Sequence, residues 1–305
     1  MESSSPIIPC LTDDVAALCL SRIPRSNFRL LSQVCRRWKT FLRSEHFTAV
    51  RKLTGRMEEF MCVLMEDKPG TSVYWEVFDS SGNKLGRIPN IPDPGPLKWG
   101  YGVTVRNEKI LFVGGFTGSI GTPLASPDVY EFSPVTNSWR KLADMNIPRY
   151  SFSLAEVDGL LYVVAIGFAF SFMSKLYVLD NGTTTIDIYD TKTKTWEMLE
   201  SDELTAVYSY IVVRNKVYFL DSERPGRLGV FDPEENSSTR VFVPTEPGGF
   251  QSKLGQWNNK VLLFLRGSVG KTIINDFDKE EGSKWRDCDQ IKLSGYHVYS
   301  VLIKF

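Results

Sequence analysis

Histidine is scarce in this chain, which has only His46 and His297 among its 305 residues. Zinc and copper sites are built from closely spaced Cys, His and Tyr ligands, and the sequence holds neither a C-x-x-C pair nor a histidine cluster. We expect His46 at a helix end and His297 in a strand. The sequence therefore predicts no metal site and no cofactor.

Cysteine is also sparse: five residues, an odd number, are scattered as Cys10, Cys19, Cys35, Cys62 and Cys288. This scatter argues against a disulfide framework, and the mostly apolar neighbours predict buried thiols in a reducing compartment. The N-terminal stretch MESSSPIIPCLTDD lacks the basic region and the apolar run of a secretory signal. We therefore expect the protein in the cytoplasm, the nucleus or both.

The chain has no long uncharged apolar run. Its most apolar stretch, LLYVVAIGFAFSFMSKLYVL at 160–179, has 16 uncharged residues between Asp158 and Lys175. A membrane-spanning helix needs about 18 or more, and strand-like repeats flank this stretch. The sequence predicts buried strands here and no membrane contact.

The net charge is zero over the whole chain but unevenly distributed. Residues 1–56 carry ten basic and four acidic side chains, hence +6, and the remaining 249 residues carry −6. Apolar residues from 12 to about 47 recur at spacings of three and four, which predicts a first helix capped by Thr12 and ended by Pro24, then a second helical series. So short an amphipathic segment cannot bury both of its faces, so we expect it to dock on a partner.

From about residue 60 the period changes to two, and strand pairs repeat. The clearest copies of an aromatic strand, a polar turn and a Trp strand are DVYEFSPVTNSWRKL at 128–142 and IDIYDTKTKTWEML at 186–199. With three weaker copies, the aromatic marker falls at Phe78, Phe132, Tyr189, Phe231 and Phe277, at spacings of 54, 57, 42 and 46 residues. These spacings predict the blades of a β-propeller.

The repeat pattern has two irregularities. After LLYVV at 160–164 the expected second strand pair is missing, because the chain passes directly to the next first pair, with Ser174-Lys175 as its predicted turn. The ring therefore has either an incomplete sixth blade or only five blades. FMCVLM at 60–65 lacks a preceding strand and GYHVYSVLIKF at 295–305 lacks a following blade; pairing the two would close the ring.

These features resemble a known family. PCLTDDVAALCLSRIPRSNFRLLSQVCRRWKTFLRSEHF at 9–47 resembles an F-box, and the strand pairs resemble kelch repeats, with Gly114-Gly115, the aromatic residue before the turn, the Trp after it and MNIPR at 145–149 as matching features. In this order the motifs are similar to those of the plant F-box/kelch-repeat proteins and cover nearly the whole chain. Two features depart from the pattern: Thr12 replaces the usual Pro after Leu11, and one strand pair is missing.

The resemblance implies a mainly β fold. A kelch-type β-propeller of about five full blades plus an incomplete one, where the family norm is six, follows a small all-α F-box module. The predicted boundaries are a disordered tail at 1–8, the F-box at 9–50, a linker at 51–59 and the propeller at 60–305, whose C-terminal strand closes the first blade.

The resemblance also implies a role as substrate receptor of an SCF (Skp–cullin–F-box) ubiquitin ligase. The F-box would bind a Skp-type adaptor, and through it a cullin and a RING protein, while the propeller would bind a target protein for ubiquitination and degradation. The residues implied for adaptor binding are Leu11, Asp14, Val15, Leu18, Ile23, Pro24, Val34, Cys35 and Trp38. The candidate target-binding residues are Trp99, Tyr101, Arg149, Tyr150 and Tyr208, chosen because aromatic and Arg side chains often carry interface energy. Packing between blades explains these five equally well.

Two short motifs suggest other activities. GSVGKT at 267–272 is similar to a phosphate-binding loop, but that motif needs Gly where Leu265 stands, so we predict a polar loop. The basic segment CRRWK at 35–39 has no aromatic platform beside it, so we expect a protein partner and no nucleic acid. One alternative function stays open: a kelch-propeller scaffold with a degenerate F-box that belongs to no ligase.

Overall fold

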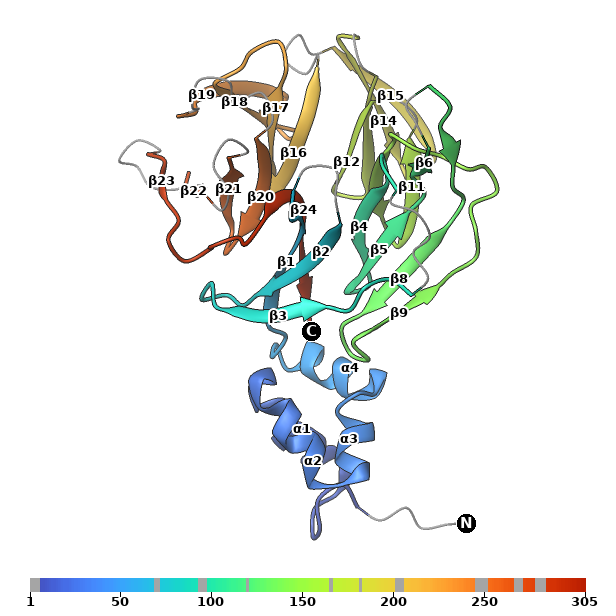
Figure 1. The fold of residues 1–305 in the computed structure, drawn as a ribbon, viewed down its shortest axis with the longest axis vertical. Helices are drawn as coiled ribbons and strands as arrows, with labels where there is room; N and C mark the ends of the chain where they lie inside the picture. Colours follow the sequence, from blue (N-terminus) through green and yellow to red (C-terminus); the bar gives the residue numbers. More distant parts are fainter. Residues whose placement is uncertain are drawn as a thin grey trace.

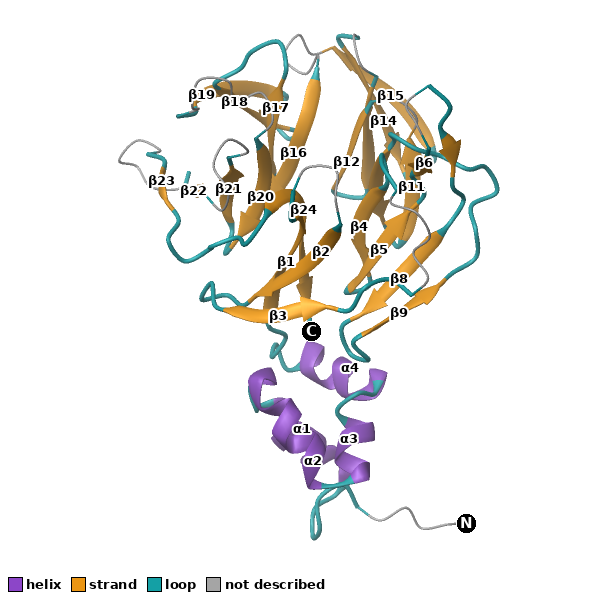
Figure 2. Ribbon diagram, in the orientation of Figure 1, coloured by secondary structure: helices purple, strands orange, loops and turns teal. Residues whose placement is uncertain are grey.

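The computed structural model describes residues 6–68, 72–92, 98–118, 121–164, 167–180, 183–200, 206–244, 252–265, 271–277 and 284–305. All of its α-helices lie together at the N-terminal end, and the strands form a ring of sheets above them (Figures 1 and 2). In the described part of the chain, no helix has the length and apolar character that crossing a bilayer requires.

The helical module contains four α-helices and one 3-10 turn. Their bounds are α1 Asp13–Ser21, η1 Arg25–Asn27, α2 Phe28–Val34, α3 Arg36–Phe41 and α4 Glu45–Leu53. The second predicted apolar series is split between α2 and α3, because Cys35 is extended, with φ −161°. Thr12 stands at the N-cap of α1, as predicted, but its side chain makes no capping hydrogen bond.

The predicted boundaries of this module differ from the structure at both ends. Residues 1–5 of the predicted tail lie outside the described residues, but Ile7 is buried in the core of the module and its carbonyl accepts a hydrogen bond from the Trp38 indole at 2.7 Å. At the other end α4 continues to Leu53, three residues into the predicted linker. The hydrophobic pattern missed both extensions because each is held by a tertiary contact or by helix continuation rather than by a periodic apolar residue.

Among the described residues, five four-stranded antiparallel sheets and one two-stranded sheet form the ring. The first sheet is β24 (Tyr296–Lys304), β1 (Glu59–Glu66), β2 (Val73–Phe78) and β3 (Lys84–Ile88); the second is β4 (Gly102–Arg106), β5 (Lys109–Val113), β8 (Val129–Ser133) and β9 (Ser138–Lys141). The two-stranded sheet is β10 (Ser153–Val157) and β11 (Leu160–Val164). The fourth is β12 (Phe168–Phe172), β13 (Lys175–Leu179), β14 (Thr185–Asp190) and β15 (Thr195–Glu200). The fifth is β16 (Val207–Val213), β17 (Lys216–Asp221), β18 (Arg227–Asp232) and β19 (Ser237–Phe242), and the sixth is β20 (Lys253–Trp257), β21 (Lys260–Phe264), β22 (Thr272–Asn275) and β23 (Arg286–Asp287). A short hairpin, β6 (Phe116–Thr117) with β7 (Leu124–Ala125), lies outside the ring sheets.

The ring closes through the C-terminal strand, as the sequence predicts. β24 pairs antiparallel with β1 from Glu59↔Lys304 to Glu66↔Tyr296. The innermost strands contact one another in the order β24, β4, β10, β12, β16, β20 and back to β24. The ring therefore has six positions, five occupied by complete blades and one by the β10–β11 pair, which confirms five full blades plus an incomplete one.

The apolar stretch at 160–179 is divided between β11, β12 and β13. Phe172 pairs with Lys175, and the turn between them is Met173-Ser174, both at positive φ of 45° and 60°. The predicted turn at Ser174-Lys175 is therefore wrong by one residue. Positive φ at both central positions is the geometry of a tight two-residue hairpin turn, and the same geometry occurs at Asp158-Gly159 between β10 and β11.

The core lies between neighbouring sheets. Facing sheets share buried apolar side chains, such as Phe60, Leu64 and Ile110 between the first and second blades. The β10–β11 pair packs on both faces, with Leu154 against the second blade and Ala155 against the fourth. Burial of both faces explains how an incomplete blade keeps its place in the ring.

The cysteine prediction is wrong in part. Cys62 and Cys288 are buried, but Cys10, Cys19 and Cys35 are exposed, and all five are free. Apolar neighbours in the sequence did not show which face of the helical module is covered. Residues 267–270 of the GSVGKT stretch lie outside the described residues, and Thr272 begins β22.

Candidate functional site

The helical module buries one side of α1 and exposes the other. Ala16, Ala17 and Leu20 are almost fully buried, whereas Val15 and Leu18 are 44% and 48% exposed. Leu30 and Val34 on α2 are 66% and 61% exposed. Apolar side chains this open on helices of a small module form a surface suited to a protein partner.

The predicted adaptor residues fall into two groups. Leu11, Asp14, Val15, Leu18, Pro24, Val34 and Cys35 are exposed, whereas Ile23 and Trp38 are half-buried and pack on the core of the module. The Trp38 indole is also bonded to Ile7, so Trp38 supports the fold of the module. The sequence prediction missed Leu30, although its spacing of four from Val34 on α2 places the two on one helix face.

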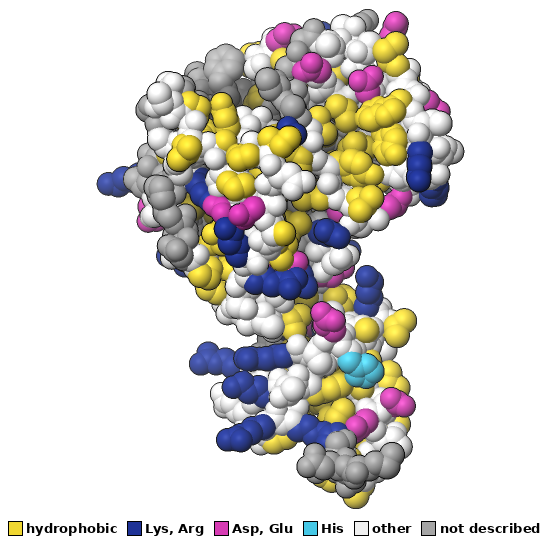
Figure 3. Space-filling model, turned by 90° about the vertical axis from the view of Figure 1, so that its right-hand side faces the viewer, with side chains coloured by type: hydrophobic (Ala, Val, Ile, Leu, Met, Phe, Trp, Pro, Cys, Tyr) yellow, Lys and Arg dark blue, Asp and Glu magenta, His cyan; other side chains and the backbone are white. Residues whose placement is uncertain are grey.

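Basic side chains gather along one side of the helical module (Figure 3). Arg22, Arg29, Arg36, Arg43, Lys39, Lys52 and Arg56 are all exposed. Only Arg37 and Arg51 of this part of the chain form ion pairs among the described residues, with Asp13 and Glu58. The +6 charge of residues 1–56 is therefore mostly available to steer an acidic partner toward the module.

The junction between the module and the ring is built around Glu58. Its Oε1 accepts hydrogen bonds from the Arg25 backbone N–H at 2.8 Å and from the Arg51 guanidinium at 2.9 Å. Arg51 is 3% exposed and also donates to the carbonyls of Ser21 and Ile23, at 3.2 and 3.0 Å. These bonds hold the segment between α1 and α2, together with the end of α4, against the residue that precedes β1.

Arg25 ties the same junction to the bottom of the ring. Its guanidinium donates to the Pro134 carbonyl at 2.8 Å and stands 3.7 Å over the Phe305 ring. Burial, with a smaller effect of the nearby Arg51 charge, lowers the pKa of Arg25 to about 9, and Glu58 opposes that shift. The helical module is therefore held in one orientation on the propeller.

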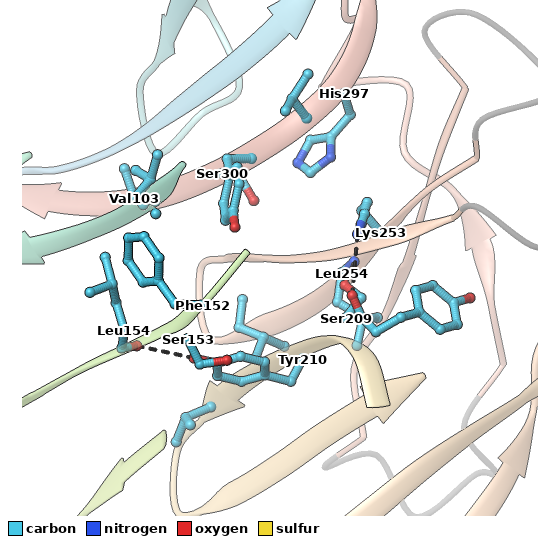
Figure 4. Close-up of a pocket in the computed structure, with 17 residues that line it drawn as sticks. Val103, Phe152, Ser153, Leu154, Ser209, Tyr210, Lys253, Leu254, His297 and Ser300 are labelled. Carbon is cyan, nitrogen blue, oxygen red and sulfur yellow. Dashed lines mark hydrogen bonds between the residues drawn. The ribbon is translucent and has the colours of Figure 1, made fainter. Parts of the chain in front are cut away.

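The central channel opens at the end of the ring opposite the helical module. Its mouth is lined by the first residues of the inner strands, including Gly102, Ser153, Lys253 and His297, around a cavity of about 260 Å³ (Figure 4). β24 begins at this mouth and ends at Phe305, beside Arg25 of the module. The far face thus presents the channel, and the near face carries the module.

His297 lies at this mouth, and its pKa is strongly lowered. Its ring stacks on Phe264 at 3.9 Å, and neither ring nitrogen has a hydrogen-bond partner among the described residues. Burial, with a smaller effect of the Lys253 charge, lowers the pKa of His297 to about 3. The imidazole is therefore neutral at physiological pH.

This shift predicts a stability loss in mild acid. With an ordinary pKa near 6.5 in the unfolded chain, His297 binds a proton there but not in the fold, so stability falls as the pH drops from about 6.5 toward 3. At pH 5 the loss is about 2 kcal/mol. Urea unfolding at pH 7.5 and 5.0 checks this, with His297→Phe expected to flatten the pH dependence. An equal loss in His297→Phe would show that other groups cause it.

The predicted target-binding residues do not all reach the surface. Trp99 and Tyr150 are 37% and 42% exposed, and both adjoin Phe116: Trp99 by paired backbone bonds and Tyr150 by ring contact at 5.0 Å. Tyr208 lines the channel mouth. Tyr101 is 8% exposed and stacks on Phe112, so its side chain packs within and between blades, and its role in target binding stays a prediction.

Arg149 belongs to the same loop cluster through its backbone. Its carbonyl accepts from the Gly115 N–H at 2.9 Å, and a Cβ on Gly114, which has φ +62°, would lie 2.6 Å from that carbonyl oxygen. Glycine at 114 therefore permits the close approach of the loop that carries Arg149 and Tyr150. Trp99, Arg149 and Tyr150 come together on one loop cluster, adjoining the start of β4 and β10.

Comparison with known proteins gives two motif matches and full-length relatives. The F-box domain model matches residues 8–49, and the Kelch motif model matches residues 100–146. An F-box/kelch-repeat protein of Arabidopsis thaliana is 58% identical, with 99% of each chain covered, and a second from the same plant is 33% identical, with 98% of this chain and 90% of the relative covered. A third is 32% identical over 68% of this chain and 57% of the relative.

The first two alignments are longer than this chain. Each of the first two runs over 343 positions, whereas this chain has 305 residues, so at least 38 positions have no counterpart here (343 less 305). That number is large enough for two strands and their connections.

Proposed function

The chain belongs to the F-box/kelch-repeat proteins, and we propose that it is the substrate-recognition subunit of an SCF-type ubiquitin ligase. In this proposal the F-box binds a Skp-type adaptor, and through it a cullin and a RING protein, while the propeller holds a target protein for ubiquitination. The protein itself acts by binding and orienting, without catalytic residues. It would work in the cytoplasm or the nucleus.

The observation that carries the proposal is the exposed apolar surface of α1 and α2. Val15, Leu18, Leu30 and Val34 all stand open to solvent at 44% or more, within the residues that match the F-box model. An apolar helix face on a soluble module favours a partner that covers it. The exposed basic side chains beside it favour an acidic partner.

The junction supports a receptor rather than two independent modules. Arg25 and Arg51 hold the F-box against the base of the propeller, and the channel mouth lies at the opposite end. A fixed arrangement of this kind places an adaptor and a target at constant separation. That is what a ligase receptor needs in order to present target lysines to the rest of the complex.

Replacing Leu18 by Asp is expected to weaken adaptor binding by about 100-fold or more, because a charge would be buried in the apolar contact. The side chain is exposed in the free protein, so the variant should keep its fold. Leu53→Asp is the matched control: Leu53 is 88% exposed on α4, outside the predicted surface. Calorimetric titration with a purified plant Skp-type adaptor gives the affinities.

Equal affinities of Leu18→Asp and the unchanged chain would contradict the proposed surface. No affinity for the adaptor in the unchanged chain would favour the alternative, a propeller scaffold with a degenerate F-box, for which Thr12 in place of the usual Pro is the motivating feature. Trp38 is also a predicted adaptor-binding residue, but Trp38→Ala is a less specific test of the adaptor surface. Loss of the hydrogen bond to Ile7 would destabilise the module as well.

A further inference from the structure

The β10–β11 pair leaves a notch in the outer wall of the propeller. Every other sheet of the ring continues from its second strand to a third and a fourth, but β11 pairs only with β10 among the described strands. β11, with the sequence LLYVV and no charged residue, therefore presents a free edge of backbone N–H and C=O groups. The notch is the space bounded by β11, β8–β9 and β14–β15.

The repeat itself shows what normally covers this space. Trp139 pairs with Phe132, and Trp196 pairs with Tyr189 at the same position of its own hairpin. Trp139 is 7% exposed, because β3 of the preceding blade lies over it, whereas Trp196 is 61% exposed. The missing third and fourth strands of the third blade leave Trp196 uncovered.

The hydrogen bonds of the Trp indole N–H groups also differ between Trp196 and its counterparts in other blades. Trp139 donates to the Pro89 carbonyl at 2.7 Å, just after β3, and Trp285 donates to the Phe242 carbonyl at 3.1 Å, at the end of β19. Each acceptor lies in, or directly after, the outermost strand of the preceding blade. Within the described part of the chain, the Trp196 indole has no such acceptor.

The exposed wall of the notch is apolar and contiguous. Met198 is 68% exposed and lies opposite Asp187, on the face that Tyr189 and Trp196 share. Ring contacts run from Tyr162 on β11 to Tyr189 at 6.3 Å and on to Trp196 at 5.0 Å. Figure 3 looks onto the side of the molecule where β11, β14 and β15 lie in Figure 1, and hydrophobic side chains gather over the propeller there.

Shape and charge restrict what can occupy the notch. β11 lies two strands inside the outermost strands β9 and β15, a recess of about 10 Å, so the β11 edges of two copies of this chain cannot meet. Asp187 and Glu200 are exposed on the notch-facing side of β14–β15. A narrow two-stranded element with apolar side chains toward Trp196 and basic ones toward the two carboxylates would fit.

We propose that the notch binds a β-hairpin of a partner protein, which completes the third blade in trans. One strand of the hairpin pairs with β11, and the second lies over Trp196 and supplies a carbonyl to its indole N–H. Main-chain pairing gives affinity, and the apolar and acidic wall selects the side chains of the hairpin. This site is separate from both the F-box surface and the channel mouth, and it does not depend on adaptor binding.

A hairpin taken from this chain provides the probe. Residues 227–243 form β18 and β19, the strand pair that covers Trp285, and contain no Trp. A synthetic peptide of this sequence, closed by an added terminal disulfide so that the hairpin is preformed, carries a fluorescent label for anisotropy titration against the full chain. We expect saturable binding and slower amide exchange at Leu160–Val164.

The variants distinguish the notch from other apolar surfaces. Trp196→Ala should weaken binding about ten-fold or more, and it should fold because the side chain is largely exposed. Phe242→Ala, at an apolar side chain that is 75% exposed on β19 of the fifth blade, should bind as the unchanged chain does. Absence of saturable binding up to about 1 mM peptide would overturn the proposal. So would binding that Trp196→Ala leaves intact, or binding that does not slow amide exchange in β11.

Discussion

Removing residues 296–305 is expected to leave the chain unable to form a soluble folded protein. β24 pairs with β1 along its whole length, and Met61 to Met65 of β1 are all nearly inaccessible. Loss of β24 would expose this strand and remove the contacts of β24 with β4 and β20. Each apolar side chain that is no longer buried costs about 1.5–3 kcal/mol. Because several are affected, the sum would equal the whole free energy of unfolding of a typical domain, about 5–15 kcal/mol.

The measurement is the soluble yield and the elution position of the truncated chain. Its control removes Phe305 alone, which loses the contact with Arg25 but leaves all of β24 in place, and should stay soluble. A truncated chain that elutes as a monomer with unchanged near-ultraviolet circular dichroism would show that the ring is closed by something other than β24.

Replacing Arg51 by Ala is expected to unfold the F-box while the propeller stays intact. The guanidinium is buried and holds two carbonyls, Ser21 and Ile23, together with Glu58. Its removal leaves the buried Ser21 carbonyl and the partly buried Ile23 carbonyl without this donor, and leaves Glu58 Oε1 with only the Arg25 N–H, at a cost of about 3 kcal/mol. A module of this size cannot absorb that loss, so adaptor binding should disappear although the adaptor surface itself is unchanged.

Limited trypsin digestion measures the effect directly. The Arg51→Ala variant should be cut within residues 6–58 at least ten times faster than the unchanged chain, leaving a resistant propeller fragment. Lys52→Ala is the matched control, since Lys52 is the exposed neighbour on α4. Equal digestion rates of Arg51→Ala and the unchanged chain would mean that the junction contributes little to holding the module.

Much of the propeller could be predicted from the sequence because its signals are local. Alternating apolar residues and two-residue turns mark each strand pair, and the unpaired FMCVLM and GYHVYSVLIKF segments require a partner, which fixes the closure of β1 with β24. The missing strand pair was visible for the same reason. The one-residue error at Met173-Ser174 shows the limit of turn placement from composition alone.

Burial and long-range bonding could not be predicted in the same way. Trp139 and Trp196 have the same place in the repeat, yet one is buried and the other is open, because exposure depends on the neighbouring blade. In the sequence, Arg51 and Glu58 cannot be told from ordinary surface charges. Their ion pair depends on the fold, which brings the two side chains together. The residue type of Tyr101 is typical of an interface, but only the fold shows that its side chain is 8% exposed.

Co-expression with a plant Skp-type adaptor, followed by size-exclusion chromatography with light scattering, tests the receptor role most directly. The predicted result is a soluble one-to-one complex, formed by the unchanged chain and lost in Leu18→Asp. Soluble chain that elutes alone, at about its own mass of 34.6 kDa, in the presence of excess adaptor would contradict the proposed function.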